Sequence, residues 1–267
     1  MRTFFSLAKQ HLRHYRLTTS IWLCIMAMMA YMVASVANSV VAGDSLKRIL
    51  DSLGGLKNLF GEPGTYEYPV DLYIQGKWLA FMPLLVGIFA VLSAMGLLAR
   101  EIDRRTADFI LTLPVRRATV LLSRFAALAV NIILLYAGSI LMIWAGLRQA
   151  HVQGALGNYA LFSLGQLALT LFIAALTVYI SLRLDDYAAA NRYALIGVIV
   201  VFSLNLVLRS VKAPQWLLWI TLFNLADPEG VVGRGQFPWP ALIAGALLTA
   251  VCLFGSVRVL EKKQVPA

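Results

Sequence analysis

Six long apolar stretches limit what this 267-residue chain can fold into more than any other feature of its sequence. A helix that crosses the hydrocarbon core of a bilayer needs about 20 mainly apolar residues, and none of the six stretches contains Asp, Glu, Lys, Arg or His. We therefore predict an all-α integral membrane protein, a single domain over residues 1–267 with six transmembrane helices. The predicted spans are residues 18–41, 78–98, 125–147, 159–182, 194–208 and 241–257.

The composition agrees with a membrane protein. Hydrophobic residues make up 60% of the chain and charged residues 13%, whereas soluble domains have about 45–50% apolar and about 25% charged residues. These proportions exclude an ordinary soluble enzyme, a disordered chain and a small disulfide-stapled module. Cys24 and Cys252 both fall within predicted spans, where cysteine behaves as a small hydrophobic residue.

The net charge of +10 has two candidate explanations. A strongly basic soluble protein often binds nucleic acid, but the basic residues of membrane proteins collect in cytoplasmic loops. Fifteen of the 23 Lys and Arg residues lie on the side of the membrane predicted to hold both termini, and six of them fall between the second and third spans. We therefore predict that both termini are cytoplasmic and that the chain binds no nucleic acid.

Three segments outside the spans also have recognisable patterns. Residues 1–17 predict either an amphipathic helix on the cytoplasmic surface of the membrane or a short basic anchor. The external loop, residues 42–77, repeats Leu and Ile at helical spacing between 46 and 56 and then turns at glycines. A seventh apolar run, residues 216–226, is too short to cross, so it is predicted to lie at the membrane surface or to re-enter it.

The sequence contains no recognisable catalytic, cofactor-binding or metal-binding motif. It has no His-Glu-x-x-His pair, no Gly-x-Ser-x-Gly turn and no Gly-x4-Gly-Lys-[Ser/Thr] loop. We therefore predict that the chain by itself is not an enzyme and holds no cofactor or metal. Proton-driven pumps normally carry carboxylates within the membrane, so the lack of ionisable residues in the predicted spans argues against that class.

Uncharged polar residues at membrane depth have two interpretations. Such residues can line a route for an amphiphilic substrate, or they can hydrogen-bond between helices and hold the bundle together. We favour the packing role for any single one, because that use is the more common. The candidates are Asn38, Asn131, Gln166, Thr170 and Asn205.

Small residues spaced four apart predict close contacts between helices. Two such pairs are Ala90 with Ala94 and Ala241 with Gly245. Small side chains on one helix face let a neighbouring backbone approach closely. This signal is weak, because small residues are frequent in membrane helices.

The cytoplasmic connection between the second and third spans, residues 100–124, is the most distinctive part of the sequence. Its residues 106–113 follow a helical pattern, and Pro114 ends that helix, because the residue before a proline is disfavoured in α conformation. The segment therefore predicts a short helix across the membrane face, framed by charges. The simpler interpretation is an ordinary basic connector.

A motif in this connection resembles the corresponding loop of ABC-2-type transporter permeases. The run reads Glu101-x-Asp103-Arg104-x-Thr106-x4-Leu111-x-Leu113-Pro114-Val115-x-Arg117, and the family commonly has an acidic cluster, Arg-Gly-Thr, leucines and Leu-Pro-Val-x-Arg. The sequence departs from that pattern at Arg105, where the family usually has glycine. The six spans, the amphipathic first segment and the cytoplasmic termini are also similar to that family.

The resemblance implies that this loop forms a coupling helix, which contacts a separate ATPase subunit. Charged and polar residues would form its start, apolar residues its contact surface, and Pro114 its turn towards the third span. The residues carried over are Glu101, Asp103, Arg104, Thr106, Phe109, Ile110, Leu113, Pro114 and Arg117.

The resemblance also implies a function and a set of partners. The chain would be the permease subunit of an ABC exporter for a hydrophobic or amphiphilic substrate such as a drug, a lipid or a peptide. ATP and Mg would bind to the partner, a nucleotide-binding subunit in two copies, and a second permease copy or a paralogue would complete the complex in the bacterial plasma (inner) membrane. The alternative is a stand-alone facilitator, channel or scaffold in the lipid bilayer without an ATPase partner.

Overall fold

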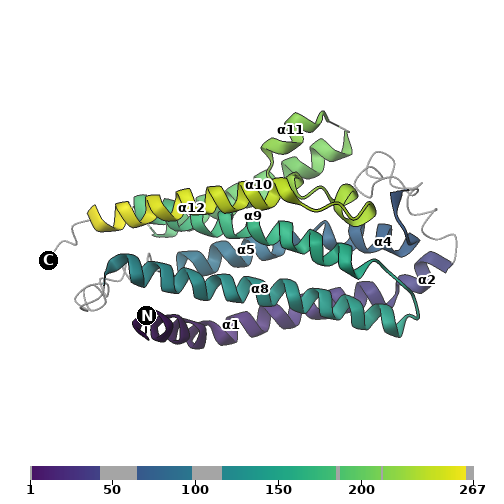
Figure 1. The fold of residues 1–267 in the computed structure, drawn as a ribbon, viewed down its shortest axis with the longest axis horizontal. Coiled ribbons are helices and arrows are strands. Elements are labelled where there is room, and N and C mark those ends of the chain that lie inside the picture. The colour runs from purple at the N-terminus through teal and green to yellow at the C-terminus, as the bar shows by residue number, and fades with distance from the viewer. Residues whose placement is uncertain (1, 43–64, 98–115, 185–186, 212, 263–267) are drawn as a thin grey trace.

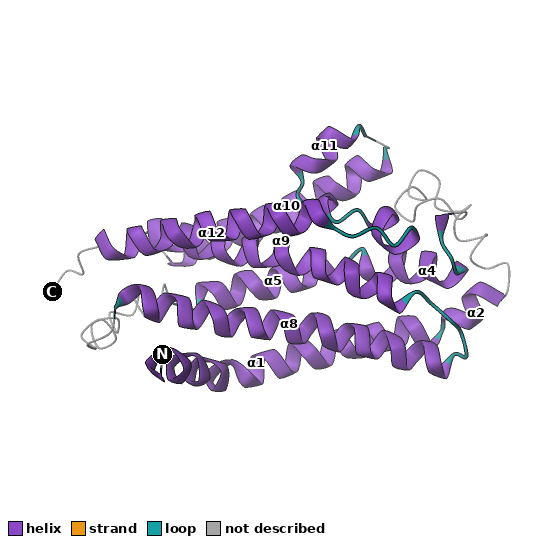
Figure 2. Cartoon of the chain, in the orientation of Figure 1, coloured by secondary structure: helices purple, strands orange, loops and turns teal. Residues whose placement is uncertain are grey.

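The computed structural model describes residues 2–42, 65–97, 116–184, 187–211 and 213–262. Within these residues the chain forms helices and connecting loops and no strand, as Figure 2 shows. Six helical segments are long and apolar enough to cross a membrane. The prediction of an all-α chain with six spans is therefore confirmed.

The six segments lie along one another with alternating direction. The start of the first and the end of the last lie at the same end of the bundle (Figure 1); we call this the terminal end and the opposite one the distal end. The segments are α1 (Arg2–Ser35), α4, η3 and α5 in succession (Pro69–Ile74, Gln75–Leu79 and Met82–Met95), α8 (Arg117–Gln149), α9 (Leu156–Arg183), α10 (Tyr187–Ser210) and α12 (Trp239–Lys262). The short elements are α2 (Ala37–Ala42), which lies at the distal end (Figure 1), and α11 (Gln215–Ile220), η4 (Phe223–Leu225) and η5 (Glu229–Gly233), which connect α10 to α12.

The first helix is longer than the predicted first span. The sequence from Arg2 to Ser35 contains neither glycine nor proline, the two residues that most readily break a helix. Residues 1–17 and 18–41 were expected to form separate elements, but α1 runs without interruption from Arg2 to Ser35. The described part of the amphipathic segment is helical, as predicted, and it is continuous with the span.

The second spanning segment begins nine residues before its predicted start at residue 78. α4 starts at Pro69, and a π-helical stretch, η3, connects it to the region before α5. Proline suits the first position of a helix, because its fixed φ is helical and no intrahelical partner is needed for its nitrogen. The external loop predicted for residues 42–77 therefore ends at residue 68, nine residues before its predicted end. The helix predicted from the leucine spacing at 46–56 lies outside the described residues.

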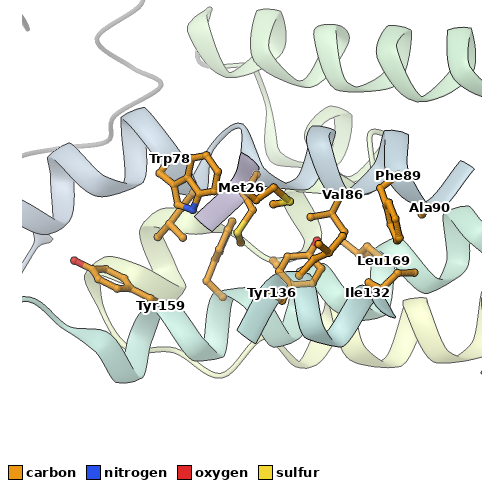
Figure 3. Close-up of a cluster of buried hydrophobic side chains, with 14 of the residues drawn as sticks. Met26, Trp78, Val86, Phe89, Ala90, Ile132, Tyr136, Tyr159 and Leu169 are labelled. Carbon is orange, nitrogen blue, oxygen red and sulfur yellow. The ribbon is translucent and has the colours of Figure 1, made fainter. Parts of the chain in front are cut away.

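The core of the bundle lies around two central segments. In the most apolar stretch of each span, 67% of the residues are buried for Pro69–Met95 and 61% for α9, against about a fifth for α1, α10 and α12. Figure 3 shows part of this core, with Trp78, Phe89, Tyr136 and Leu169 among its side chains. The three outer helices keep large apolar faces that membrane lipid or another protein can cover.

Glycines allow the closest contacts between helices. A Cβ atom at Gly245 of α12 would lie 2.7 Å from backbone atoms of Ala168 in α9, and one at Gly146 of α8 would lie 2.6 Å from the Cβ of Ala34 in α1. The small-residue pair Ala241 and Gly245 was predicted to mark a close approach, and both residues are buried. This close approach is confirmed for Gly245.

Candidate functional site

An apolar cleft of about 190 Å³ lies between α9 and α10. α9 contributes one wall, α10 the second, and the turn after α11 closes it with Thr221, Leu222 and Phe223. The helix residues that line the cleft are Leu169, Phe172, Ile173, Leu176, Thr177 and Ile180 of α9 and Tyr193, Ala194, Gly197, Val198 and Val201 of α10.

The chemistry of the cleft suits an apolar or amphiphilic molecule. Two hydroxyl groups in its lining already donate to carbonyls of their own turns, Thr177 to Ile173 at 2.8 Å and Thr221 to Leu218 at 2.6 Å. A Cβ atom at Gly197 would meet nothing within 4 Å, so this glycine leaves open space in the α10 wall. Ligand sites are typically clefts that are mostly apolar with a few polar groups.

The turn that closes the cleft is strained and held by hydrogen bonds. Leu222 has a φ of 60°, a left-handed conformation that costs a residue with a side chain about 1–3 kcal/mol. Asn205 of α10 donates its side-chain N–H to the Thr221 hydroxyl at 2.6 Å, and Gln166 of α9 donates to the Phe223 carbonyl at 3.1 Å. The two bonds fix the turn on either side of Leu222 and bring it against both helices.

Asn205→Ala is expected to loosen this turn. The substitution removes the bond to Thr221, and side-chain hydrogen bonds between membrane helices contribute about 0.6–2 kcal/mol each. We expect a lower thermal midpoint for the full chain in detergent and faster hydrogen exchange over residues 221–225. Ser203→Ala, at an exposed position of the same helix, is the matched control, and equal exchange in both variants would contradict the role of Asn205.

The other predicted polar residues are spread through the bundle. Thr170 of α9 and Tyr136 of α8 share a hydrogen bond of 2.8 Å between their hydroxyl oxygens. Asn131 is buried in α8, and Asn38 is exposed in α2. Gln166, Thr170 and Asn205 thus bond to other elements of the bundle, and two of these bonds support the wall of the cleft rather than a polar route.

The predicted coupling residues lie almost entirely outside the described residues. These are Glu101, Asp103, Arg104, Thr106, Phe109, Ile110, Leu113 and Pro114. Arg117 is described: it begins α8 and donates from its guanidinium to the Leu260 carbonyl of α12 at 3.1 Å. This bond satisfies a carbonyl in the last turn of α12, where a cation is favourable.

A second site, at the distal end, is polar and has no motif in the sequence. Asp71 of α4 is completely buried, and the Tyr159 hydroxyl and the Ala155 backbone N–H both donate to its Oδ1, the latter at 3.1 Å. Nearby, Tyr66 donates to Gln75 at 2.6 Å, and burial together with the Glu229 charge raises the pKa of the Tyr66 phenol above its usual value. Asp71 was predicted to lie in the external loop. Pro69 is the sequence signal that could have placed it in a helix, because proline is common at the first helical position.

One known protein family matches almost the whole chain. The family described as "multidrug efflux system permease Rv1217c, C-terminal domain" matches residues 5–258. The chain belongs to this family. A search among curated proteins found no match to the chain. Membership of the Rv1217c family agrees with the predicted multi-pass membrane permease and supports an ABC-type permease in general, while the ABC-2 type stays a prediction.

Proposed function

We propose that the chain is the membrane subunit of an ABC exporter that expels hydrophobic or amphiphilic compounds such as drugs, lipids or peptides. The match to a multidrug efflux permease family over residues 5–258 carries this proposal. The cleft between α9 and α10 supports it, because its almost wholly apolar walls fit cargo of that kind. The bacterial plasma membrane is the expected location.

The energy source in this proposal is ATP bound with Mg to a separate nucleotide-binding subunit. Two such subunits would act on two permeases, either identical or paralogous. Contact with the ATPase is assigned to the loop at 100–124, because its sequence resembles the coupling loop of ABC-2 permeases. The alternative is a stand-alone facilitator, channel or scaffold that works without an ATPase.

Affinity purification of the tagged chain in mild detergent tests the proposal. We expect a P-loop ATPase to co-elute in stoichiometric amount. We also expect Arg104→Glu and Leu113→Ala to reduce its recovery about tenfold or more, as the loss of about 1.4 kcal/mol of binding energy would. Arg148→Glu is the matched control, because Arg148 is an exposed cation at the distal end of α8.

The outcome separates the two functions. Recovery of the chain alone, in several detergents and with nucleotide present, would favour the stand-alone protein. Full recovery of the ATPase with both loop variants would overturn the assignment of the coupling helix and leave the ATPase partner in place.

A further inference from the structure

The Asp71 carboxyl is not accounted for by the packing of the bundle. Its side chain is completely buried. Tyr159 and the Ala155 N–H both donate to Oδ1, and the Tyr68 backbone N–H also contributes a hydrogen bond to the carboxyl group. Oδ2 is buried without a hydrogen-bond partner. Figure 3 shows the Tyr159 hydroxyl pointing away from the labelled apolar side chains of the core, so this donor faces a separate, polar site.

The charged groups that the structure describes around Asp71 do not compensate a negative charge on it. Among the described residues, no Lys, Arg or His forms an ion pair with Asp71. The titratable groups nearest in the chain or on packed elements are Tyr159 of α9, Tyr66, Glu67 and Tyr68 before α4, Tyr73 of α4 itself, Lys77 of η3 and exposed His151 before α9. Glu229 of η5 accepts from Thr65 at 3.2 Å and lies 3.9 Å from Arg234. The charges of Asp227 and of Arg209 in α10 act on Tyr66, whereas the charge that acts on Asp71 itself is that of Glu67. α2, which also packs on α4, has no titratable residue.

We propose that Asp71 and Tyr159 form a proton-binding site at the distal end of the bundle, with the proton on Oδ2 of Asp71 while this end is closed. An isolated buried carboxylate is strongly disfavoured and neutralises when no cation pairs with it. The two donors keep Oδ1 as the accepting carbonyl oxygen, so the proton resides on the other oxygen. The site is neutral in the conformation that the structure shows.

The closure of the site selects a proton over a larger cation. Gly154, just before the donor at Ala155, approaches so closely that a Cβ atom there would lie 2.9 Å from the Tyr159 hydroxyl oxygen and 3.1 Å from Oδ1 of Asp71. The loop between α8 and α9 therefore covers Oδ1 next to the Tyr159 hydroxyl of α9, and Oδ2 is buried as well. A substrate ammonium group would need this loop to move away.

In this proposal, Asp71 is protonated only while the loop at 150–155 covers it. When the loop at 150–155 moves off α4, Asp71 becomes hydrated and releases its proton to water. Closing again requires a proton to return. This inference needs neither the ATPase partner nor the cleft, so it can fail or hold independently of the proposed function.

Infrared spectroscopy of the full chain in lipid nanodiscs tests the proposal directly. A protonated carboxyl has a C=O stretching band that a carboxylate lacks, and exposed Asp and Glu side chains are ionised at pH 7. We expect a band of a buried carboxylic acid at pH 7 that disappears in Asp71→Asn and persists in Glu67→Gln, a matched change at an exposed carboxylate nearby. Absence of the band in the unmodified chain, or its survival in Asp71→Asn, would overturn the proposal.

A second variant keeps the test decisive if Asp71→Asn does not fold. Tyr159→Phe leaves the carboxyl in place and removes one of the two donors to Oδ1. We expect the band to remain and to move to higher frequency, because its carbonyl oxygen accepts one hydrogen bond fewer. A band at unchanged frequency would show that the protonated carboxyl is not the one that Tyr159 contacts.

Discussion

Gly197→Phe is expected to reduce efflux of a neutral lipophilic dye such as Nile red about tenfold or more, a loss equivalent to about 1.4 kcal/mol or more of productive binding. Gly197 lines the cleft between α9 and α10, and its missing side chain leaves the space next to α10 open. A phenylalanine ring there would occupy much of a cleft of about 190 Å³. Efflux is measured in cells that also express the ATPase recovered with the chain.

The variant should block the cleft without damaging the fold. A Cβ atom at 197 meets no other atom within 4 Å, and phenylalanine has a higher helix propensity than glycine. Gly157→Phe is the matched control, since a Cβ at Gly157 also meets nothing within 4 Å and this glycine does not line the cleft. Normal efflux by Gly197→Phe, with the protein present at normal level, would exclude the cleft as the substrate site.

The spans could be predicted from the sequence because their apolar runs are long. The lipid-facing and buried sides of these helices are both apolar, so hydropathy identifies them without knowledge of any contact. The start of the second span could not be found in this way, because Asp71, Gln75 and Lys77 lower the hydropathy of its first turns. Gln75 accepts a hydrogen bond from Tyr66, and Asp71 accepts one from Tyr159. Tyr159 is far away in the sequence and Tyr66 lies outside the helix, so neither contact follows from the local sequence.

Several residues that form or support the cleft could be predicted from the sequence, but their contacts could not. Asn205 and Gln166 were recognised as polar residues at membrane depth, and the run at 216–226 as too short to cross. What the sequence does not show is that both side chains bond to that run and hold Leu222 in a left-handed conformation that favours glycine. A leucine with positive φ follows no local preference, so only the tertiary contacts explain it.

Gly245→Leu is expected to destabilise the bundle strongly. A Cβ atom at this position would lie 2.7 Å from the backbone carbon and oxygen of Ala168 and 2.8 Å from its Cβ. Backbone atoms in the middle of α9 cannot move aside as a flexible side chain can, so the two helices must separate. Overpacking of this kind costs about 1–3 kcal/mol, and the long contact between α9 and α12 places the loss at the upper end of that range.

The measurement is the thermal midpoint of the purified full chain, together with the fraction that elutes as a single species on size exclusion. Ala246→Leu adds a larger side chain at the next position, which is exposed, and should leave both quantities close to those of the unmodified chain. Both variants place a leucine in the same turn of α12 but on different faces, and the loss of glycine by itself favours the helix, so a lower stability of Gly245→Leu reports the contact with Ala168. Equal stability of the two would mean that α9 and α12 are not in contact at Gly245.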